Sequence, residues 1–449
     1  MTDVRDNTPL VLGTEKIGKL LMQYAIPAII AMTASSLYNM VDSIFIGHGV
    51  GPLAIAGLAI TFPLMNLAAA FGSLVGVGAS TLVAIKLGQK DKESATHVLG
   101  NVVLLNAIIG LIFMTVALVF LNPILLFFGA SPDTLPYARE YMEVILAGNL
   151  ITHIYMGLNE VLRASGYPRK AMTATLMAVI VNCVLDALFI LVFEWGIRGA
   201  ALATIMAQVI SLSWQLHHFF DKKSFLHFQR GIFGLKRHIV GGMLAIGLSP
   251  FLMNLCACFV VILINKSLKA HGGDLAIGAY GIVNRVVFLF IMIVMGFNQG
   301  MQPIAGYNFG ARQFDRLIQV LKYTIFCGVT VTTIGFLSGQ LFPRSIVYLF
   351  TTDAELIRIA VEGLRIVVIF FPVVGFQMVT SSFFQSIGMA KKAIFLSLTR
   401  QLLFLIPSLL ILPNFFGTDG VWMSMPVADA IATIVAALML RWQLKHLKV

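Results

Sequence analysis

Long apolar stretches recur along the whole chain and are separated by short polar breaks. A helix that crosses a bilayer needs about 20 predominantly apolar residues. Hydrophobic residues make up 58% of the sequence and charged residues only 11%, against roughly 25% charged in soluble domains. We therefore predict an all-α polytopic membrane protein with 12 transmembrane helices, at residues 17–47, 53–84, 95–121, 140–162, 169–193, 197–220, 239–265, 275–306, 316–342, 355–387, 391–413 and 420–441.

The Lys and Arg residues gather in alternate breaks between these stretches, and their distribution predicts the orientation of the chain. Lys86, Lys90 and Lys92 lie in one such break, and Lys222 and Lys223 lie in another. Cytoplasmic loops carry an excess of basic residues, so we place both termini in the cytoplasm. This distribution also accounts for the net charge of +11, and we expect lipid rather than nucleic acid as the partner.

An internal repeat predicts two lobes. A shift of 222 residues, the difference between positions 300 and 78, superposes glycines and a lysine at matching places: Gly78 on Gly300, Gly88 on Gly310, Gly166 on Gly388, and Lys170 on Lys392. A repeat of six spans enters the membrane twice in the same direction, so we expect pseudo-two-fold symmetry along the membrane normal. The predicted parts are an N-lobe at 1–220, a cytoplasmic linker at 221–238 and a C-lobe at 239–449.

Asp42 and Asp186 are carboxylic acids that lie inside long apolar spans, where charged groups are costly and mark functional sites. Asp186 lies four residues after Asn182, so the two share one helix face. From the helical rise, Asp42 and Thr204 lie roughly 8 Å, and Asp186 roughly 12 Å, from the outer ends of their spans. These groups are expected to converge in the N-lobe, where oxygen atoms could bind a proton or a hard cation.

The second half of the chain does not repeat this chemistry, because the counterparts of these four residues are Ile264, Phe404, Ser408 and Met425. Pro27 precedes Asp42 in the first span, and proline kinks a helix. We predict that bending at Pro27 couples the acidic site to movement of that span. Weaker candidates for a substrate pocket are Tyr38, Met65 and Met206, and the roles of Arg285 and Arg400 stay open.

Several motifs resemble those of the multidrug and toxic compound extrusion (MATE) family, specifically its DinF-type prokaryotic branch. They are VDSIFIGHGVGPLAIAG, KLGQKD with its partner NFGARQFD, LRASGYPRKAM, NCVLDALFI and GIRGAALATIMAQ. The resemblance covers nearly the whole chain and implies a cation-coupling site at Asp42, Asn182, Asp186 and Thr204, with Pro27 as the bending proline. It also implies antiport, in which H+ or Na+ moves inward while small organic, often cationic, compounds move out.

Two other functions are alternatives to this one. A flippase for a lipid-linked precursor would carry more basic residues in its central cavity than Arg285 and Arg400. A membrane-embedded enzyme would need a nucleophile with a base or a metal cluster, and the sequence has no HExxH, GxSxG or Walker A motif. We therefore expect a monomeric transporter that is not an enzyme and has no cofactor, with H+ or Na+ left open as the coupling ion.

Overall fold

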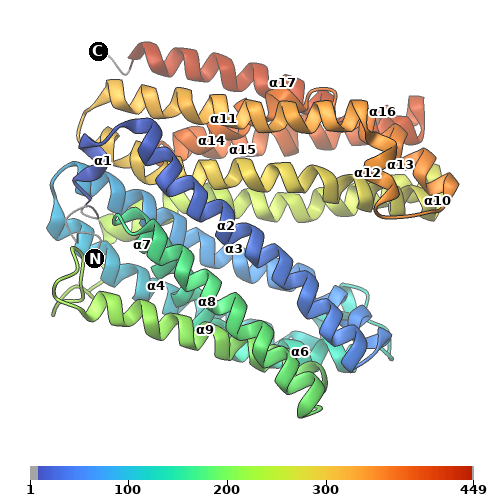
Figure 1. The fold of residues 1–449 in the computed structure, drawn as a ribbon, viewed down its shortest axis with the longest axis horizontal. Helices are drawn as coiled ribbons and strands as arrows, with labels where there is room; N and C mark the ends of the chain where they lie inside the picture. Colours follow the sequence, from blue (N-terminus) through green and yellow to red (C-terminus); the bar gives the residue numbers. More distant parts are fainter. Residues whose placement is uncertain (1–8, 447–449) are drawn as a thin grey trace. The chain divides into compact units, whose positions relative to one another are not determined.

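The computed structural model describes residues 9–446, and these residues form helices and turns without a strand (Figure 1). The helices that carry the first half of the chain are α1 (Val11–Thr14), α2 (Ile17–Gly49), α3 (Pro52–Gly88), α4 (Lys92–Val119), α5 (Leu121–Phe127), α6 (Leu135–Ala147), α7 (Asn149–Ala164), α8 (Pro168–Asp186), the π-helix η2 (Ala187–Val192) and α9 (Gly196–Phe220). The second half contains α10 (Arg237–Gly310), α11 (Phe314–Leu341), α12 (Pro343–Tyr348), α13 (Ala354–Val367), α14 (Phe371–Ser386), α15 (Ala390–Leu398), the π-helix η3 (Thr399–Leu405), α16 (Ile406–Phe416) and α17 (Thr418–His446).

Most predicted spans correspond to one helix. Within residues 9–446, ten helices are long and apolar enough to cross a membrane, or up to eleven if α13 and α14, bent by 56°, form one span. The all-helical polytopic fold is thereby confirmed. Residues 221–236 contain no helix, and α10 is interrupted at Gly273, whose φ of 69° and ψ of −164° are not helical.

The predicted span at 140–162 forms two helices, α6 and α7, that meet at Gly148. Neither helix is long enough and apolar enough to count as a span by itself. Glu140, Glu143, His153 and Glu160 interrupt its apolar pattern. Three of these polar groups have partners in the protein: Glu143 pairs with Arg139, Glu160 pairs with Arg163, and His153 Nε2 lies 3.0 Å from the Ala68 carbonyl oxygen. Glu140 is exposed.

The helices pack into two compact units. The described part of unit 1 comprises residues 9–15 and 30–251, and that of unit 2 comprises residues 16–29 and 252–446. Helix α2 therefore contributes its first turns to unit 2 and the remainder to unit 1. The lobe boundaries predicted from the repeat stay a prediction.

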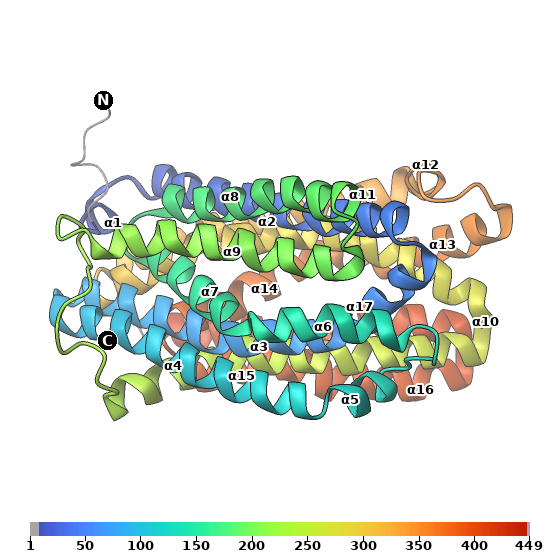
Figure 2. The same cartoon turned by 90° about the horizontal axis from the view of Figure 1, so that it is seen from below.

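Unit 1 is stabilised by an apolar core and by close contacts between the backbones of neighbouring helices. Ile46, Leu125, Tyr141 and Leu146 are among the fully buried side chains of the core. Helices α8 and α9 lie side by side (Figures 1 and 2). Helix α3 meets the beginning of α10 without room for a side chain, since a Cβ atom on Gly247 would collide with the Leu74 carbonyl.

Unit 2 has its own core around Trp422, which is 1% exposed. A Cβ atom on Gly363 would meet the Trp422 ring at 2.7 Å, and one on Gly375 would meet the Gly328 carbonyl oxygen at 2.5 Å. These glycines let the helices approach closely, as small residues do between transmembrane helices.

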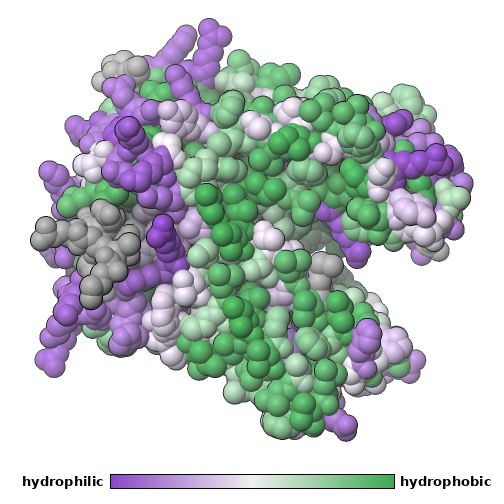
Figure 3. Space-filling model, in the orientation of Figure 1, coloured by the Kyte–Doolittle hydropathy of each residue, from purple (hydrophilic) through white to green (hydrophobic). Residues whose placement is uncertain are grey.

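The outer sides of the helices are apolar. Hydrophobic side chains cover their middle parts on the face drawn in Figure 3, and hydrophilic ones gather toward their ends. Phe127 is 84% exposed and Phe326 is 72% exposed. Such large exposed apolar side chains match a surface that lipid covers.

We predict that Gly247→Ala destabilises the protein, because the new methyl group meets backbone that cannot move cheaply. Overpacking of this kind costs roughly 1–3 kcal/mol. Gly241→Ala on the same helix is the control, because a Cβ atom there has nothing within 4 Å. Thermal unfolding in detergent should show a lower Tm for Gly247→Ala alone, and equal Tm values for the two variants would contradict the packing argument.

Candidate cation-coupling site

Three helices of unit 1 bring the four predicted coupling residues together. Asp42 lies on α2 and is 4% exposed, Asn182 and Asp186 lie on α8 and are 3% and 0% exposed, and Thr204 lies on α9. The side chains interact with one another, as the following contacts show. Their functional role stays a prediction.

The end of α8 positions Asp186. Helix α8 ends at this residue and continues directly as the π-helix η2. A π-helix has wider turns than an α-helix and is frequent at functional sites. Asn182 and Asp186, one α-helical turn apart, point to the same side before this change of helix type.

A hydrogen-bond network surrounds Thr204. Its hydroxyl lies 2.9 Å from the hydroxyl of Tyr38, and the Asn182 amide nitrogen donates to it at 3.3 Å. If the Asn182 amide is turned by 180°, its nitrogen lies 3.3 Å from Asp186 Oδ2 and 3.1 Å from the Tyr38 hydroxyl, and its oxygen accepts from the Thr204 backbone N–H at 2.9 Å. The second orientation fits an ionised Asp186 better, because it donates to that carboxylate.

Asp42 and Asp186 are close enough to share a hydrogen bond. The Oδ1 atom of each is buried and has no hydrogen-bond partner. Two buried carboxylates with unsatisfied oxygens repel each other unless a proton or a cation lies between them. The oxygens of Asp42, Asp186, Asn182, Thr204 and Tyr38 fit either ion, because hard cations take oxygen ligands.

Tyr141 on α6 is a neighbour of this site that the sequence analysis missed. It is 1% exposed, interacts with the Thr204 hydroxyl and lies near both carboxyl groups. It belongs to the predicted span whose polar residues are spread over two helices. The spacing of residues along α6 gives no sign that it faces Asp42.

A cavity of about 170 Å³ adjoins the site in unit 1. Its walls come from α2, α7, α8 and α9 and comprise Ser35, Tyr38, Asn39, Tyr155, Thr175, Ala178, Val179, Asn182, Thr204, Ala207 and Gln208. Of the weaker pocket candidates, Tyr38 lines this cavity. Met65 packs against the unit 1 core, and Met206 is 43% exposed and does not line the cavity.

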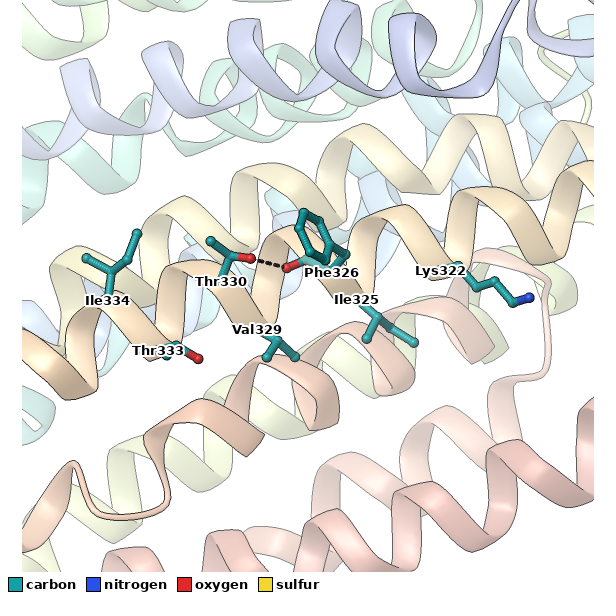
Figure 4. Close-up of a pocket in the computed structure, with 7 residues that line it drawn as sticks. All are labelled: Lys322, Ile325, Phe326, Val329, Thr330, Thr333 and Ile334. Atoms are coloured by element: carbon teal, nitrogen blue, oxygen red, sulfur yellow. Dashed lines mark hydrogen bonds between the residues drawn. The ribbon is translucent and has the colours of Figure 1, made fainter.

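A larger hollow, of about 530 Å³, runs along α11 and is formed by residues of that helix alone (Figure 4). Its walls are mainly apolar, and the Thr330 hydroxyl donates to the Phe326 carbonyl at 2.7 Å within the helix. Hydroxyls satisfied in this way are tolerated on a lipid-facing helix surface. We interpret this hollow as membrane-facing surface rather than as a site.

Pro27 lies in the part of α2 that belongs to unit 2, where it is buried. The helix continues through it, and the boundary between the units lies between residues 29 and 30. Close contacts hold the helix nearby, since Cβ atoms on Gly296 and Gly300 would meet the backbone of Ile29 and Ala25. A bend at Pro27 would therefore occur next to a tightly packed segment.

Unit 2 contains an ion pair that the sequence analysis did not identify. Arg400, on the π-helix η3, donates from Nε to Asp429 Oδ1 of α17 at 2.5 Å. The Asp429 side chain is 7% exposed and that of Arg400 is 30% exposed. The second half of the chain lacks counterparts of the four predicted coupling residues, but it contains this buried acid. The sequence does not reveal the pair, because the partner of a single acid in an apolar stretch depends on how the helices pack.

The comparisons with known proteins identify the family. The MatE family model matches residues 27–188 and 246–410. The chain belongs to the MATE family of transporters. It is accordingly a transporter and not an enzyme.

Relatives and solved structures agree with this assignment. The multidrug export protein MepA of Staphylococcus aureus (strain MSSA476) is 27% identical over 428 residues, which cover 94% of this chain and 92% of the relative. A MOP superfamily transporter from Pyrococcus furiosus matches with a TM-score of 0.92 at 26% identity over 98% of both chains. A MATE crystal structure in the bent conformation matches with a TM-score of 0.93 at 27% identity, also over 98% of both chains.

We predict that Asp429→Asn destabilises unit 2, because the Arg400 guanidinium then keeps its charge without a counter-charge. Removing one partner of a fully buried pair costs about 3–5 kcal/mol, and the partial exposure of Arg400 reduces this figure. The double variant Asp429→Asn/Arg400→Gln should recover much of the loss in a double-mutant cycle of thermal unfolding. Additive effects of the two substitutions would show that the pair is not coupled.

Proposed function

We propose that the chain is a secondary antiporter that exports small organic, often cationic, compounds in exchange for inward H+ or Na+. The observation that supports this most is the pair of buried carboxyl groups, Asp42 and Asp186, with unpartnered oxygens in unit 1. Its relatives carry the name multidrug export protein, which supports the substrate class. The expected place of action is a bacterial inner membrane, with both termini in the cytoplasm and the protein as a monomer.

The physical basis is the charge of the pair. With no ion bound, two negative charges lie together among apolar helices, where water does not screen them. A bound proton or Na+ removes much of the repulsion, so the loaded and empty site favour different arrangements of the surrounding helices. A ligand shifts a conformational equilibrium by its difference in affinity for the two states, and this difference would drive alternating access.

Pro27 offers the means of transmitting that shift. Asp42 and Pro27 share α2, and the segment around Pro27 packs in unit 2 whereas Asp42 packs in unit 1. Proline lacks the N–H that would stabilise a straight helix at this point. A shift of the α2 segment around Asp42 on ion binding is therefore expected to bend or straighten α2 at Pro27.

The arrangement of basic residues gives little support to the flippase alternative. The Arg400 charge is compensated by Asp429 at 2.5 Å, so it offers a pyrophosphate less than a free arginine would. Arg285 is exposed on α10. An isolated arginine is a weak basis for binding a lipid-linked diphosphate.

We predict that Asp42→Asn and Asp186→Asn each reduce export of ethidium from cells to background, because an amide cannot carry the charge that the coupling ion neutralises. Asp133→Asn, at an exposed position outside the helices, is the control and should retain full export. Surface expression of all variants is measured in parallel. Normal export by both site variants, at normal expression, would refute the coupling role.

The coupling ion can be identified in proteoliposomes that hold the purified protein. A pH gradient and a sodium gradient are imposed separately, and uptake of a fluorescent cation is followed. If protons couple, the pH gradient alone drives transport and a protonophore stops it. Transport driven by the sodium gradient alone identifies Na+, and transport that ignores both gradients would contradict antiport.

A further inference from the structure

Helix α9 carries a polar stripe, defined here as Thr204, Gln208, Ser211, Gln215 and His218. Their spacings of four, three, four and three residues place all five side chains on one face of a helix. Positions 204 and 218 are 14 residue steps apart, which is about 21 Å at the rise of an α-helix. It begins at the cation-coupling site and ends in the last turn of α9.

The stripe faces α7 and α8 within unit 1, and most of its members have partners there. The Thr152 hydroxyl of α7 donates to the Gln208 side-chain oxygen at 2.5 Å. The Ser211 hydroxyl donates to the Ala174 carbonyl of α8 at 2.6 Å. At the end of the stripe, Lys170 Nζ lies 2.8 Å from His218 Nδ1.

Gln215 is the exception. It is 0% exposed, and neither its side-chain nitrogen nor its side-chain oxygen has a hydrogen-bond partner. Leaving a buried polar group unpaired costs about 1–3 kcal/mol, and an amide that serves only packing would be replaced by an apolar side chain at no such cost. An amide with a free donor and a free acceptor suits water molecules or a passing ion.

The beginning of the stripe borders a cavity. Thr204 and Gln208 line the cavity of about 170 Å³ beside the carboxyl pair. A cavity of that size has room for several water molecules, each of which needs two to four polar partners. Tyr155 and Thr175 provide further partners on α7 and α8. Beyond the cavity, Ser211, Gln215 and His218 continue the same line of polar groups.

We propose that the polar stripe of α9 lines a hydrated path through unit 1, by which the coupling cation leaves Asp42 and Asp186 toward Lys170 and His218, and that Gln215 is its narrow point. The proposal rests on the proposed antiport. The end of the path is the side that the basic loops assign to the cytoplasm. The path would separate release of the ion from movement of the organic substrate.

The charged groups around the exit suit release. His218 faces Lys170 of α8, and Asp221 follows at the end of α9. On α7, Arg163 pairs with Glu160 at 3.1 Å. The Lys170 ammonium disfavours a cation that stays at this end, and an ion path needs an exit at which binding is weak.

The test compares Gln215→Leu with Ser213→Leu in proteoliposomes. Ser213 lies on the same helix, is exposed and only donates to its own helix, to Val209 O at 2.8 Å. A pH-sensitive dye and a sodium-sensitive dye inside the vesicles follow ion movement during ethidium transport, and ethidium binding is measured on protein in detergent. We expect Gln215→Leu to slow coupled ion flux and ethidium transport at least about tenfold, with ethidium Kd within about twofold of wild type, and Gln215→Asn to restore part of the flux. Ser213→Leu should behave as wild type.

Wild-type ion flux in Gln215→Leu would overturn the path, and so would a parallel loss of ethidium binding and flux, which would indicate a structural role. A failure of the proposed antiport would give a different result from a failure of the path. In that case the wild-type protein itself would transport neither H+ nor Na+ together with ethidium. The dye that responds in the wild type distinguishes H+ from Na+.

A second measurement does not depend on Gln215 variants. In a background without the four native cysteines, Ser211→Cys and Ser213→Cys are exposed to a water-soluble thiol reagent from the side of the α9 C-terminus. A hydrated path predicts labelling of position 211 at least about tenfold faster than of position 213. Equal or slower labelling at 211 would overturn the proposal.

Discussion

Two buried carboxyl groups, which repel each other when both are ionised, lie at the centre of the polar groups of unit 1. Asp42 and Asp186 come from helices far apart in the sequence, and each leaves one oxygen without a partner. Low polarity around them makes their mutual charge expensive. The neighbouring hydroxyl and amide groups of Tyr38, Asn182 and Thr204 can adjust their hydrogen bonds to the ion that we propose to bind there, because hydroxyls rotate and amides turn.

Irregular helix geometry recurs where charged side chains are held. Asp186 is followed at once by the π-helix η2, and Arg400 lies within the π-helix η3. In each place the backbone changes from an α-helix to a π-helix at or beside a charged side chain that contacts another helix: Asp186 contacts Asp42 of α2, and Arg400 contacts Asp429 of α17. The break at Gly148 similarly separates Tyr141 on α6 from the polar residues of α7. Regular spans supply the apolar exterior, and the interruptions direct the polar groups inward.

The sequence predicted the helical spans well because hydrophobic length and basic loops act locally along the chain. Asp42 and Asp186 were singled out because acids in apolar stretches stand out, and Asn182 and Thr204 because of their spacing and depth in the predicted spans. Their functional role stays a prediction. Tyr141 and the pairing of Asp429 with Arg400 could not be found in this way, since they depend on which helix faces which. The polar stripe of α9 was readable in principle from its spacing of three and four residues, but its isolated Gln and Ser residues are common in membrane helices, and only burial and missing partners single out Gln215.

The division of α2 and α10 between the two units affects how the chain can be cut. Residues 16–29 belong to unit 2, and residues 237–251, which open α10, belong to unit 1. A cut in the non-helical segment 221–236 would thus leave each fragment holding a piece of the other's core. The first fragment would keep the segment of α2 that packs against Gly296 and Gly300. The second would keep the segment of α10 that contains Gly247 and packs against Leu74. Two such fragments would have to be made together in one cell to assemble, and neither could serve as an independent half transporter.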